Sequence, residues 1–327
     1  MRTKWWLSLA FAAIPAAWGA PRTATPGTVN YVEGQVSLDG RQLTTAQDGS
    51  AALAANQMLS VANGKAEVLL SPGSFLRVGS NSEVRMIAAE LSDPRVEVVR
   101  GEAMLEVDYK PKMAHLDVME RGADAEMLKE GLYKFDADEA RIQVIDGKAA
   151  VTDNGQTKEI GKGKELVING GPLKAVSFDR KAEDDLYRWS DVRASYIAQA
   201  NEASARTIYV NGGYGWGWGP GWFWNPYYAT YAWLPGDGLF WSPFGYPFFS
   251  PGYVAYAPYV RGRFYPGTAH TVVPAGRGAV GVGRIGAGRA SGFASPGVRS
   301  FGGGGHFAGG GGHFAAGGGH LGGAVRR

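Results

Sequence analysis

The chain has 327 residues, 50 of them glycine, and a formal net charge of +3. This length admits two ordinary domains, but glycine and aromatic residues crowd into the second half, so only the first half has the composition of a packed core. The absence of cysteine excludes disulfides, thiolate metal sites and cysteine nucleophiles. We therefore expect one folded domain followed by a long tail of biased composition.

Residues 1–19 have the features of a secretory signal peptide. Basic residues near the start precede an apolar run from Trp5 to Trp18, and small residues suit cleavage after Gly19. A membrane anchor is the competing interpretation, but the run is short and contains Pro15. Glycine and proline interrupt every later apolar segment. The sequence predicts a periplasmic or secreted, cell-surface protein without a membrane span.

Residues 26–172 predict an all-β domain, and the clearest part runs from Asn63 to Met86. Three stretches of strand-like alternation are separated there by a Ser-Pro-Gly turn and a Gly-Ser-Asn-Ser turn, each expected to reverse the chain. The inward positions are Ala66, Val68, Leu70, Leu76, Val78, Val84 and Met86. The positions between them include Glu67 and Arg77, and we expect this charged face to be solvated.

Dipeptides that accept positive φ recur along this domain and predict tight hairpin turns. They are Asp39-Gly40, Asn63-Gly64, Asp146-Gly147 and Asn154-Gly155. Short strands joined by such turns fit either a β-sandwich or a solenoid-like roll of strand pairs. The alternation is weaker between Lys110 and Glu130, which we interpret as a strand, a turn and a strand.

The same segments resemble the FecR-domain family. The order of apolar alternation, Pro-Gly-Ser, Leu-Arg-Val-Gly and Asn-Ser is similar to the core of that family. Flanking segments also resemble it: residues 27–29, 34–36, 96–103, 131–135 and 144–151. The resemblance covers roughly residues 26–170 and favours the roll. It implies an extracytoplasmic sensor that relays a signal to a sigma factor. Because no cytoplasmic head and transmembrane helix are expected here, only a sensing or interaction role is carried over.

From residue 179 onward the apolar period becomes helical. Residues 179–206 predict an amphipathic helix that Asp179 caps, with acidic residues in its first turns. Its apolar stripe consists of Leu186, Trp189, Val192 or Arg193, Tyr196 and Ala200. A helix that binds a partner is one interpretation. Packing of the stripe on the β domain, or a bridge to the tail, is favoured.

Residues 207–266 are rich in Trp, Tyr, Gly and Pro and form a predicted interaction region. Neither the helical nor the strand period persists, so we expect no ordinary helix or sheet core there. Exposed rings can stack on the apolar faces of sugars. The candidate ligand-binding residues are Trp216, Trp218, Trp222, Trp224, Trp233 and Trp241. Packing of the rings against one another or the β domain, or self-association, is favoured because no polar constellation accompanies them.

Residues 267–327 form a Gly/Arg/His-rich segment that we expect to be disordered. His306, His313 and His320 recur at a fixed spacing, but a glycine-rich chain does not preorganise a metal site. Arginine supplies the only cations of this tail. Export makes nucleic acid an unsuitable ligand, whereas anionic envelope polymers or lipid headgroups suit the same side chains.

No catalytic, cofactor-binding or metal-binding residues are predicted. The segment Gly281 to Gly286 matches a dinucleotide fingerprint without its strand and helix, and neither His115 nor His270 stands in a nucleophile relay. The sequence therefore favours a non-enzymatic exported cell-envelope protein, with a sensing or interaction domain and an adhesive tail. Its partner is expected to be an envelope polymer, a protein or another copy of itself. The alternatives are a carbohydrate-binding surface protein and an envelope-polymer hydrolase whose site is assembled in space.

Overall fold

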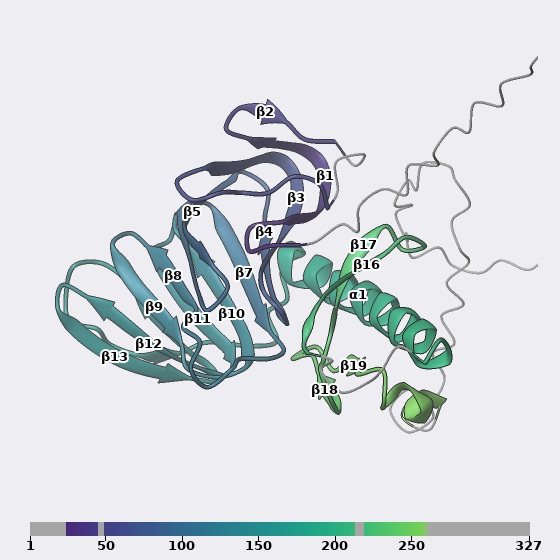
Figure 1. Cartoon of the computed structure of the whole chain (residues 1–327). Helices are drawn as coiled ribbons and strands as arrows, with labels where there is room; N and C mark the ends of the chain where they lie inside the picture. Colours follow the sequence, from purple (N-terminus) through teal and green to yellow (C-terminus); the bar gives the residue numbers. More distant parts are fainter. Residues whose placement is uncertain (1–23, 45–48, 213–218, 259, 261–327) are drawn as a thin grey trace, which may run out of the picture. The chain divides into compact units, whose positions relative to one another are not determined.

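The computed structural model describes residues 24–44, 49–212, 219–258 and 260, all of which belong to one compact unit. Fifteen strands in these ranges form one continuous, curled sheet, which is followed by a long helix and two small hairpins (Figure 1). This confirms the predicted mostly-β fold with one helix after it. The predicted signal peptide and the segment from residue 267 onward lie outside the described residues.

The elements follow one another along the chain in this order. The strands of the large sheet are β1 (Val29–Leu38), β2 (Arg41–Gln42), β3 (Met58–Ser71), β4 (Ser74–Val78), β5 (Ser82–Glu90), β6 (Asp93–Arg100), β7 (Glu102–Val107), β8 (Asp117–Glu120), β9 (Ala123–Met127), β10 (Gly131–Asp136), β11 (Arg141–Asp146), β12 (Lys148–Asp153), β13 (Gln156–Gly161), β14 (Lys164–Val167) and β15 (Val176–Ser177). Then come α1 (Asp185–Val210), β16 (Gly221–Asn225), β17 (Thr230–Leu234), β18 (Leu239–Trp241), β19 (Pro247–Phe249) and the 3-10 helix η2 (Val254–Tyr256).

The large sheet is built outward from the hairpin of β3 and β4. The order across it is β13-β12-β9-β8-β6-β5-β3-β4-β7-β10-β11-β14-β15, with β1 paired to β3 and β2 to β1. After the β3–β4 hairpin, each later group of one or two strands is therefore added to the opposite edge of the sheet from the group before it. All pairs are antiparallel except β6 with β8, which are parallel. One sheet that curls over its own inner face corresponds to the predicted roll, not to two stacked sheets (Figure 1).

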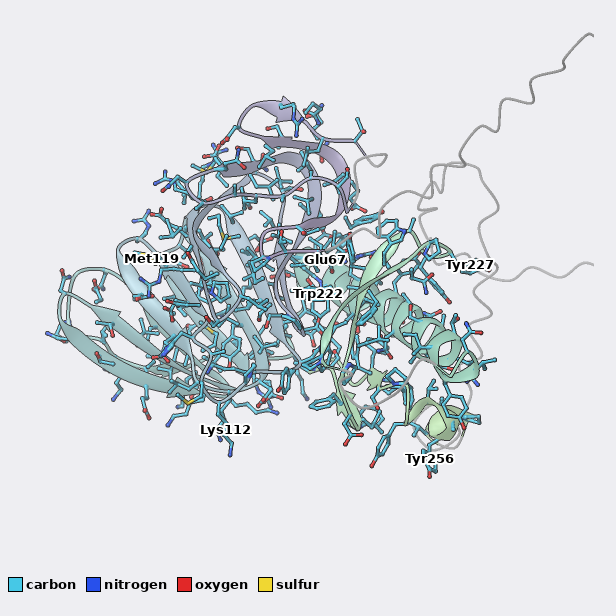
Figure 2. All side chains as sticks on the ribbon, in the orientation of Figure 1. Glu67, Lys112, Met119, Trp222, Tyr227 and Tyr256 are labelled. Carbon is cyan, nitrogen blue, oxygen red and sulfur yellow. The ribbon has the colours of Figure 1, made fainter. Side chains whose placement is uncertain are left out.

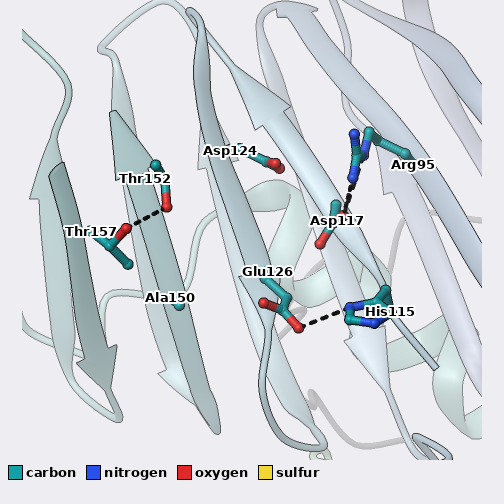
Figure 3. Close-up of a pocket in the computed structure, with 8 residues that line it drawn as sticks. All are labelled: Arg95, His115, Asp117, Asp124, Glu126, Ala150, Thr152 and Thr157. Atoms are coloured by element: carbon teal, nitrogen blue, oxygen red, sulfur yellow. Dashed lines mark hydrogen bonds and ion pairs between the residues drawn. The ribbon is translucent and has the colours of Figure 1, made fainter. Parts of the chain in front are cut away.

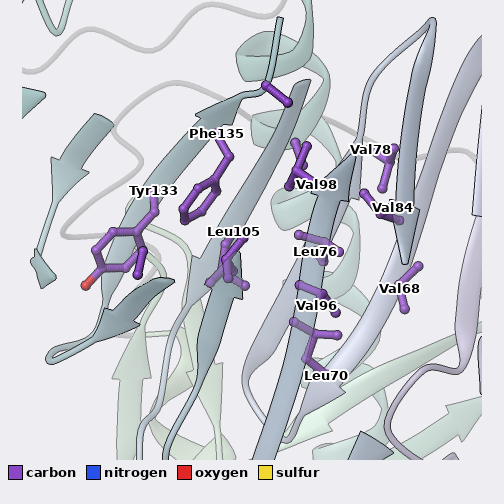
Figure 4. Packing of buried hydrophobic residues seen from close by; sticks show 14 of the residues in the cluster. Val68, Leu70, Leu76, Val78, Val84, Val96, Val98, Leu105, Tyr133 and Phe135 are labelled. Carbon is purple, nitrogen blue, oxygen red and sulfur yellow. The ribbon is translucent and has the colours of Figure 1, made fainter. Parts of the chain in front are cut away.

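The inner face of the sheet forms the main hydrophobic core. All seven inward positions predicted in β3, β4 and β5 belong to this cluster and are inaccessible to solvent. Figure 4 shows Val68, Leu76 and Val84 beside residues from neighbouring strands, with Tyr133 and Phe135 further along the same face. The period of two residues therefore predicted the inner face correctly, because side chains of a strand alternate strictly between its two faces.

The two turns predicted around β4 differ in what they do. Ser71 pairs with Ser74 across a hairpin, so the Ser-Pro-Gly turn reverses the chain as predicted. The Gly-Ser-Asn-Ser turn does not, because β4 and β5 are both antiparallel to β3 and continue along it in one direction. Asn81, with φ of 57°, offsets the two strands without reversing them. The prediction of a second reversal was wrong.

Two of the four predicted turn dipeptides form hairpin turns, and the other two do not. Asp39-Gly40 joins the paired strands β1 and β2, and Asn154-Gly155 joins β12 and β13, as predicted. Asn63-Gly64 instead lies inside β3, where Gly64 faces Gly34 of β1. A Cβ atom at Gly64 would lie 1.9 Å from the Glu33 carbonyl oxygen, so glycine permits a close strand approach here. Asp146-Gly147 connects β11 to β12, which are not paired with each other.

Helix α1 begins later than the sequence predicted. Its N-cap is Asp184, whose carboxylate accepts a hydrogen bond from the Tyr187 amide at 2.7 Å, whereas Asp179 caps a turn before the helix. Arg193, not Val192, lies on the buried side of the helix, and Val192 is 66% exposed. The favoured interpretation that the stripe packs within the domain is correct. No helix among the described residues is long and apolar enough to cross a membrane.

The described part of the aromatic region is folded, contrary to the prediction that it holds no ordinary sheet. Strands β16 and β17 pair from Gly221 to Leu234, and β18 pairs with β19. Every residue of β17 is buried. Together with α1 and η2 these strands form what we call the C-terminal cover, which packs on the outer face of β3, β4 and β7. This second hydrophobic cluster includes Leu69, Phe75, Ile197, Tyr231, Trp233, Phe248 and Phe249.

Candidate functional site

A layer of buried charge lies between the large sheet and the C-terminal cover. Glu67 of β3, Arg77 of β4 and Glu106 of β7 occupy neighbouring strands, and the side chains of all three are inaccessible to solvent. Arg77 joins the two carboxylates, with Nε 3.0 Å from Glu67 Oε2 and Nη1 2.5 Å from Glu106 Oε2. Figure 2 shows Glu67 where the sheet meets the cover, near Trp222.

The cover supplies further partners to this layer. Arg193 Nη2 of α1 lies 2.8 Å from Glu67 Oε1, and the Ser242 hydroxyl, just after β18, donates to Glu106. Asn30 of β1 donates to Glu67 and also binds the backbone of Tyr231 in β17. Burial alone would raise the pKa of Glu67, but Arg193 and Arg77 more than offset it and lower the pKa. Glu67 is therefore held as a carboxylate.

This layer corrects the prediction that the charged face of β3 and β4 is solvated. The alternation was read correctly, since Glu67 and Arg77 do point away from the main core. A period of two residues gives the side of the sheet but not what covers that side. The signal that was available is Arg193 on the otherwise apolar stripe of α1, because a buried arginine requires a carboxylate partner.

The six candidate tryptophans lie in different environments. Trp233 is fully buried, with its ring stacked on Tyr109 at 5.7 Å and edge-on to Phe240 at 5.2 Å. Trp222 packs edge-on against Phe75 at 5.2 Å, and Trp224 against Tyr231 at 5.1 Å. These three rings pack inside the C-terminal cover or against the sheet, in agreement with the favoured packing interpretation.

The rings that reach solvent lie elsewhere on the cover. Trp241, at the end of β18, is 37% exposed. Tyr253 and Tyr256 are also exposed, and their ring centroids are 5.9 Å apart. Figure 2 shows Tyr227 and Tyr256 at the periphery of the cover, away from the large sheet. Trp216 and Trp218 lie outside the described residues.

A polar pocket of about 380 Å³ lies on the outer face of the strands away from the cover. Its lining comes from β6, β8, β9, β12, β13 and the segment just before β8, and it consists of Arg95, His115, Asp117, Asp124, Glu126, Ala150, Thr152 and Thr157 (Figure 3). Arg95 Nη2 lies 2.7 Å from Asp117 Oδ2, and the Thr152 and Thr157 hydroxyls are 2.9 Å apart. Burial raises the pKa of Asp117 despite the contact with Arg95.

The pocket brings His115 to a carboxylate that the sequence did not place beside it. His115 Nδ1 lies 3.2 Å from Glu126 Oε1, although eleven positions separate the two residues. The pairing of β8 with β9 produces this contact, since Asp117 is opposite Glu126. Both side chains are largely exposed, and no serine or threonine hydroxyl bonds to the imidazole within the described part of the chain. The pair suits ligand contact better than a nucleophile relay.

No group of three or more His, Asp or Glu side chains is arranged to hold a metal ion within residues 24–44, 49–212, 219–258 and 260. The repeated histidines at positions 306, 313 and 320 lie outside these ranges. The pocket is therefore best described as a polar surface with hydroxyl, carboxylate and guanidinium groups, able to form directed hydrogen bonds to a ligand or a protein surface.

Part of the chain matches a protein-family model. Residues 57–156 match the model described as FecR protein. These residues run from just before β3 to the start of β13, and they include the buried charges of β3, β4 and β7 as well as most of the polar pocket. The match over residues 57–156 confirms the FecR resemblance seen in the sequence for that part of the chain.

Two crystal structures described as a "putative anti-sigma factor from Parabacteroides distasonis ATCC 8503" are also similar. One, at 2.50 Å resolution, has 21% identity and a TM-score of 0.33, and the match covers 38% of this chain and 61% of that one. The other, at 1.65 Å, has 18% identity and the same TM-score, with coverage of 41% and 63%. The matched region therefore spans less than two thirds of those chains. A search of curated proteins finds no match.

Proposed function

We propose that this chain is a non-enzymatic, exported cell-envelope protein whose FecR domain senses or binds a protein partner. The observation that carries the proposal is the FecR match over residues 57–156. The polar face of β6, β8 and β9 offers the binding surface, because His115 and Glu126 are accessible there and the opposite face of these strands is core. The exposed rings and the arginines of the tail add adhesion to an envelope polymer or to another copy of the chain.

Partner binding can be tested with a photo-crosslinking amino acid in intact cells. Met119 of β8 lies on the same face as Asp117, since two positions separate them, and it is partly exposed (Figure 2). Val192 on the exposed side of α1 serves as the control position. We expect a discrete crosslinked product from Met119 and not from Val192. Identical products from both positions, or none from Met119, would contradict the proposed binding face.

Export is tested separately, because binding does not depend on it. Alkaline phosphatase fused after the first 40 residues is expected to be active in cells, since the enzyme requires an oxidising compartment. The matched fusion lacks residues 5–18 and is expected to be inactive. Equal phosphatase activity of the two fusions would contradict the proposal that the protein is exported.

The exposed rings favour a second candidate, a carbohydrate-binding surface protein. Trp241, Tyr253 and Tyr256 are solvent-exposed rings of the cover. The full chain should sediment with insoluble envelope polymer at both 0.1 M and 1 M salt if rings dominate, because stacking survives screening. Release at 1 M salt would assign the contact to the tail arginines instead. Trp241→Ala should weaken only the salt-resistant fraction.

The hydrolase alternative has a direct test on the same material. The full chain is expected to release no soluble fragments from isolated envelope polymer. Release that His115→Ala abolishes would assign a hydrolytic site to the pocket and overturn the non-enzymatic proposal.

A further inference from the structure

The buried layer contains two guanidinium groups and three carboxyl groups. Arg77 pairs with Glu67 and Glu106, and Arg193 pairs with Glu67. These two cations balance two carboxylates, which leaves Asp108 without a cation among the described residues. Asp108 is 3% exposed, and neither of its carboxyl oxygens accepts a hydrogen bond from them. A buried charge without a partner is costly, so the layer is neutral only when this third carboxyl group carries a proton.

Asp108 lies directly beneath the C-terminal cover. It directly follows the last residue of β7, and its pKa responds to the charges of Glu106, Arg77 and Glu67. Ser242 of the cover donates to that glutamate. The next residue, Tyr109, stacks on Trp233 of β17 at 5.7 Å. Glu106 and Tyr109, two residues before and one residue after Asp108, both contact the cover, so a charge at Asp108 lies beside the docking interface.

We propose that docking of the C-terminal cover is coupled to one proton on the buried carboxyl group of Asp108. The cover stays closed while the proton is bound, and it opens more often once the proton has left. Opening exposes to water the face that carries Leu69, Phe75 and the ion-paired Glu67, Arg77 and Glu106. This device goes beyond the proposed function and does not depend on it.

The groups that face Asp108 favour its protonated form. Burial is the largest cause that raises its pKa well above the ordinary 3.8, and the charge of Glu106 is the next. Glu67 adds to this effect, whereas Arg77 opposes it. Within the cover, Arg193 of α1 pairs with Glu67 of the buried layer. Strands β16 to β19 contain no Asp, Glu, Lys, Arg or His.

The direction of the pH effect follows from these groups. The pKa of Asp108 is higher under the cover than in water, so closing takes up a proton. Docking is therefore strongest at low pH and weakens as the pH rises above the ordinary value of 3.8. For one proton, the equilibrium constant for opening the cover rises by at most about tenfold per pH unit. It stops rising once the pH exceeds the raised pKa of Asp108.

Thiol labelling can measure this opening, because the chain has no cysteine of its own. Ser190 of α1 is fully buried and its hydroxyl makes no hydrogen bond within the described residues, so Ser190→Cys is a nearly isosteric probe under the cover. Ala149→Cys, inside the main core, reports global unfolding. Labelling rates of the full-length variants from pH 5 to pH 9 are divided by rates in denaturant at the same pH, which removes the titration of the thiol.

We expect the normalised rate at S190C to rise at least about tenfold between pH 5 and pH 8 and to exceed the rate at A149C at every pH, because the cover opens without global unfolding. Added to S190C, Asp108→Asn should abolish most of the rise, whereas Glu120→Gln, at another buried carboxyl group, should leave it. A flat profile at S190C, a rate at S190C no faster than the rate at A149C, or an unchanged rise in the D108N background would overturn the proposal. If the D108N variant does not fold, the pH dependence of labelling at S190C in the otherwise unmodified chain tests the proposal by itself.

Discussion

Glu67 is the residue at which removal of one carboxylate should matter most. Glu67→Ala leaves Arg77 and Arg193 with less compensation in a buried layer, so we expect a loss of about 3–5 kcal/mol in the free energy of unfolding. Urea unfolding measures it. Glu97→Ala is the matched control, because Glu97 pairs with Arg85 on the accessible face, and it should cost less than about 1 kcal/mol. Equal losses would mean that the face of β3 is solvated after all.

A second buried carboxyl group gives the domain a pH-dependent stability of its own. Burial, with a smaller contribution from Asp136, raises the pKa of Glu120 to about 8 from its ordinary 4.5. The folded state then binds the proton more tightly than the unfolded state. Stability falls as the pH rises from 4.5 towards about 8, by up to about 1.4 kcal/mol per pH unit.

Glu120→Gln should therefore reduce this dependence, because its amide does not titrate. Denaturant midpoints at pH 5, 7 and 9 measure the effect, and the difference from the unmodified chain should grow with pH. The control is Glu139→Gln at an exposed position, which should follow the unmodified chain throughout. A constant offset between Glu120→Gln and the unmodified chain would show that Glu120 is ionised at all three pH values.

Individual residues show where sequence reasoning stopped. Val68 and Leu76 were assigned to the core correctly because alternation specifies a face. Burial of the opposite face, with Leu69 and Phe75 on it, depends on elements more than a hundred residues later in the chain. The contact between His115 and Glu126 depends likewise on strand register, which alternation leaves open.

At the scale of elements, α1 should depend on Asp184 and not on Asp179. Asp184 caps the Tyr187 amide and pairs with Lys134 of β10. Asp184→Ala removes both contacts and should cost about 1–2 kcal/mol, a typical value for a lost cap with a partly buried partner. Asp179→Ala, at the position that the sequence suggested as the cap, should be nearly neutral. Thermal unfolding, monitored by circular dichroism, compares the stability of the two variants. A larger loss for Asp179→Ala than for Asp184→Ala would mean that the helix begins at Asp179.

The hairpin of β16 and β17 was missed for a physical reason. A strand buried on both faces has no alternation, and β17 reads Thr-Tyr-Ala-Trp-Leu with every position buried. A turn signal was present, since Asn225 accepts hydrogen bonds from the amides of Tyr227 and Tyr228 just after the strand. The Trp, Tyr, Gly and Pro content of residues 207–266 led instead to the prediction that this region contains no ordinary sheet. The short segment between Lys110 and Glu130 was assigned correctly because β8 and β9 retain alternation.

For the whole molecule, the position of a truncation should decide whether it folds. Composition alone, which gives the aromatic region no ordinary sheet, would allow a chain ending at Arg206 to keep its cooperative unfolding. It lacks β16 to β19, so it exposes Leu69, Phe75 and the buried charges, and we now expect aggregation or loss of a cooperative transition. A chain ending at Val260 should melt like the full chain. Differential scanning calorimetry distinguishes the two outcomes, and cooperative melting of the shorter chain would make the cover dispensable.

The alternating order of the large sheet has a consequence for how the domain is assembled. Each later strand pair meets an edge that earlier strands have already made, so the sheet can grow while the rest of the chain is still being delivered. Pulse-labelled hydrogen exchange should then protect β3 to β5 before β12 to β15, and simultaneous protection would argue against this order. The cover arrives last. Until it does, Glu67, Arg77 and Glu106 remain hydrated, and the domain loses that water only when synthesis of its own closing segment is complete.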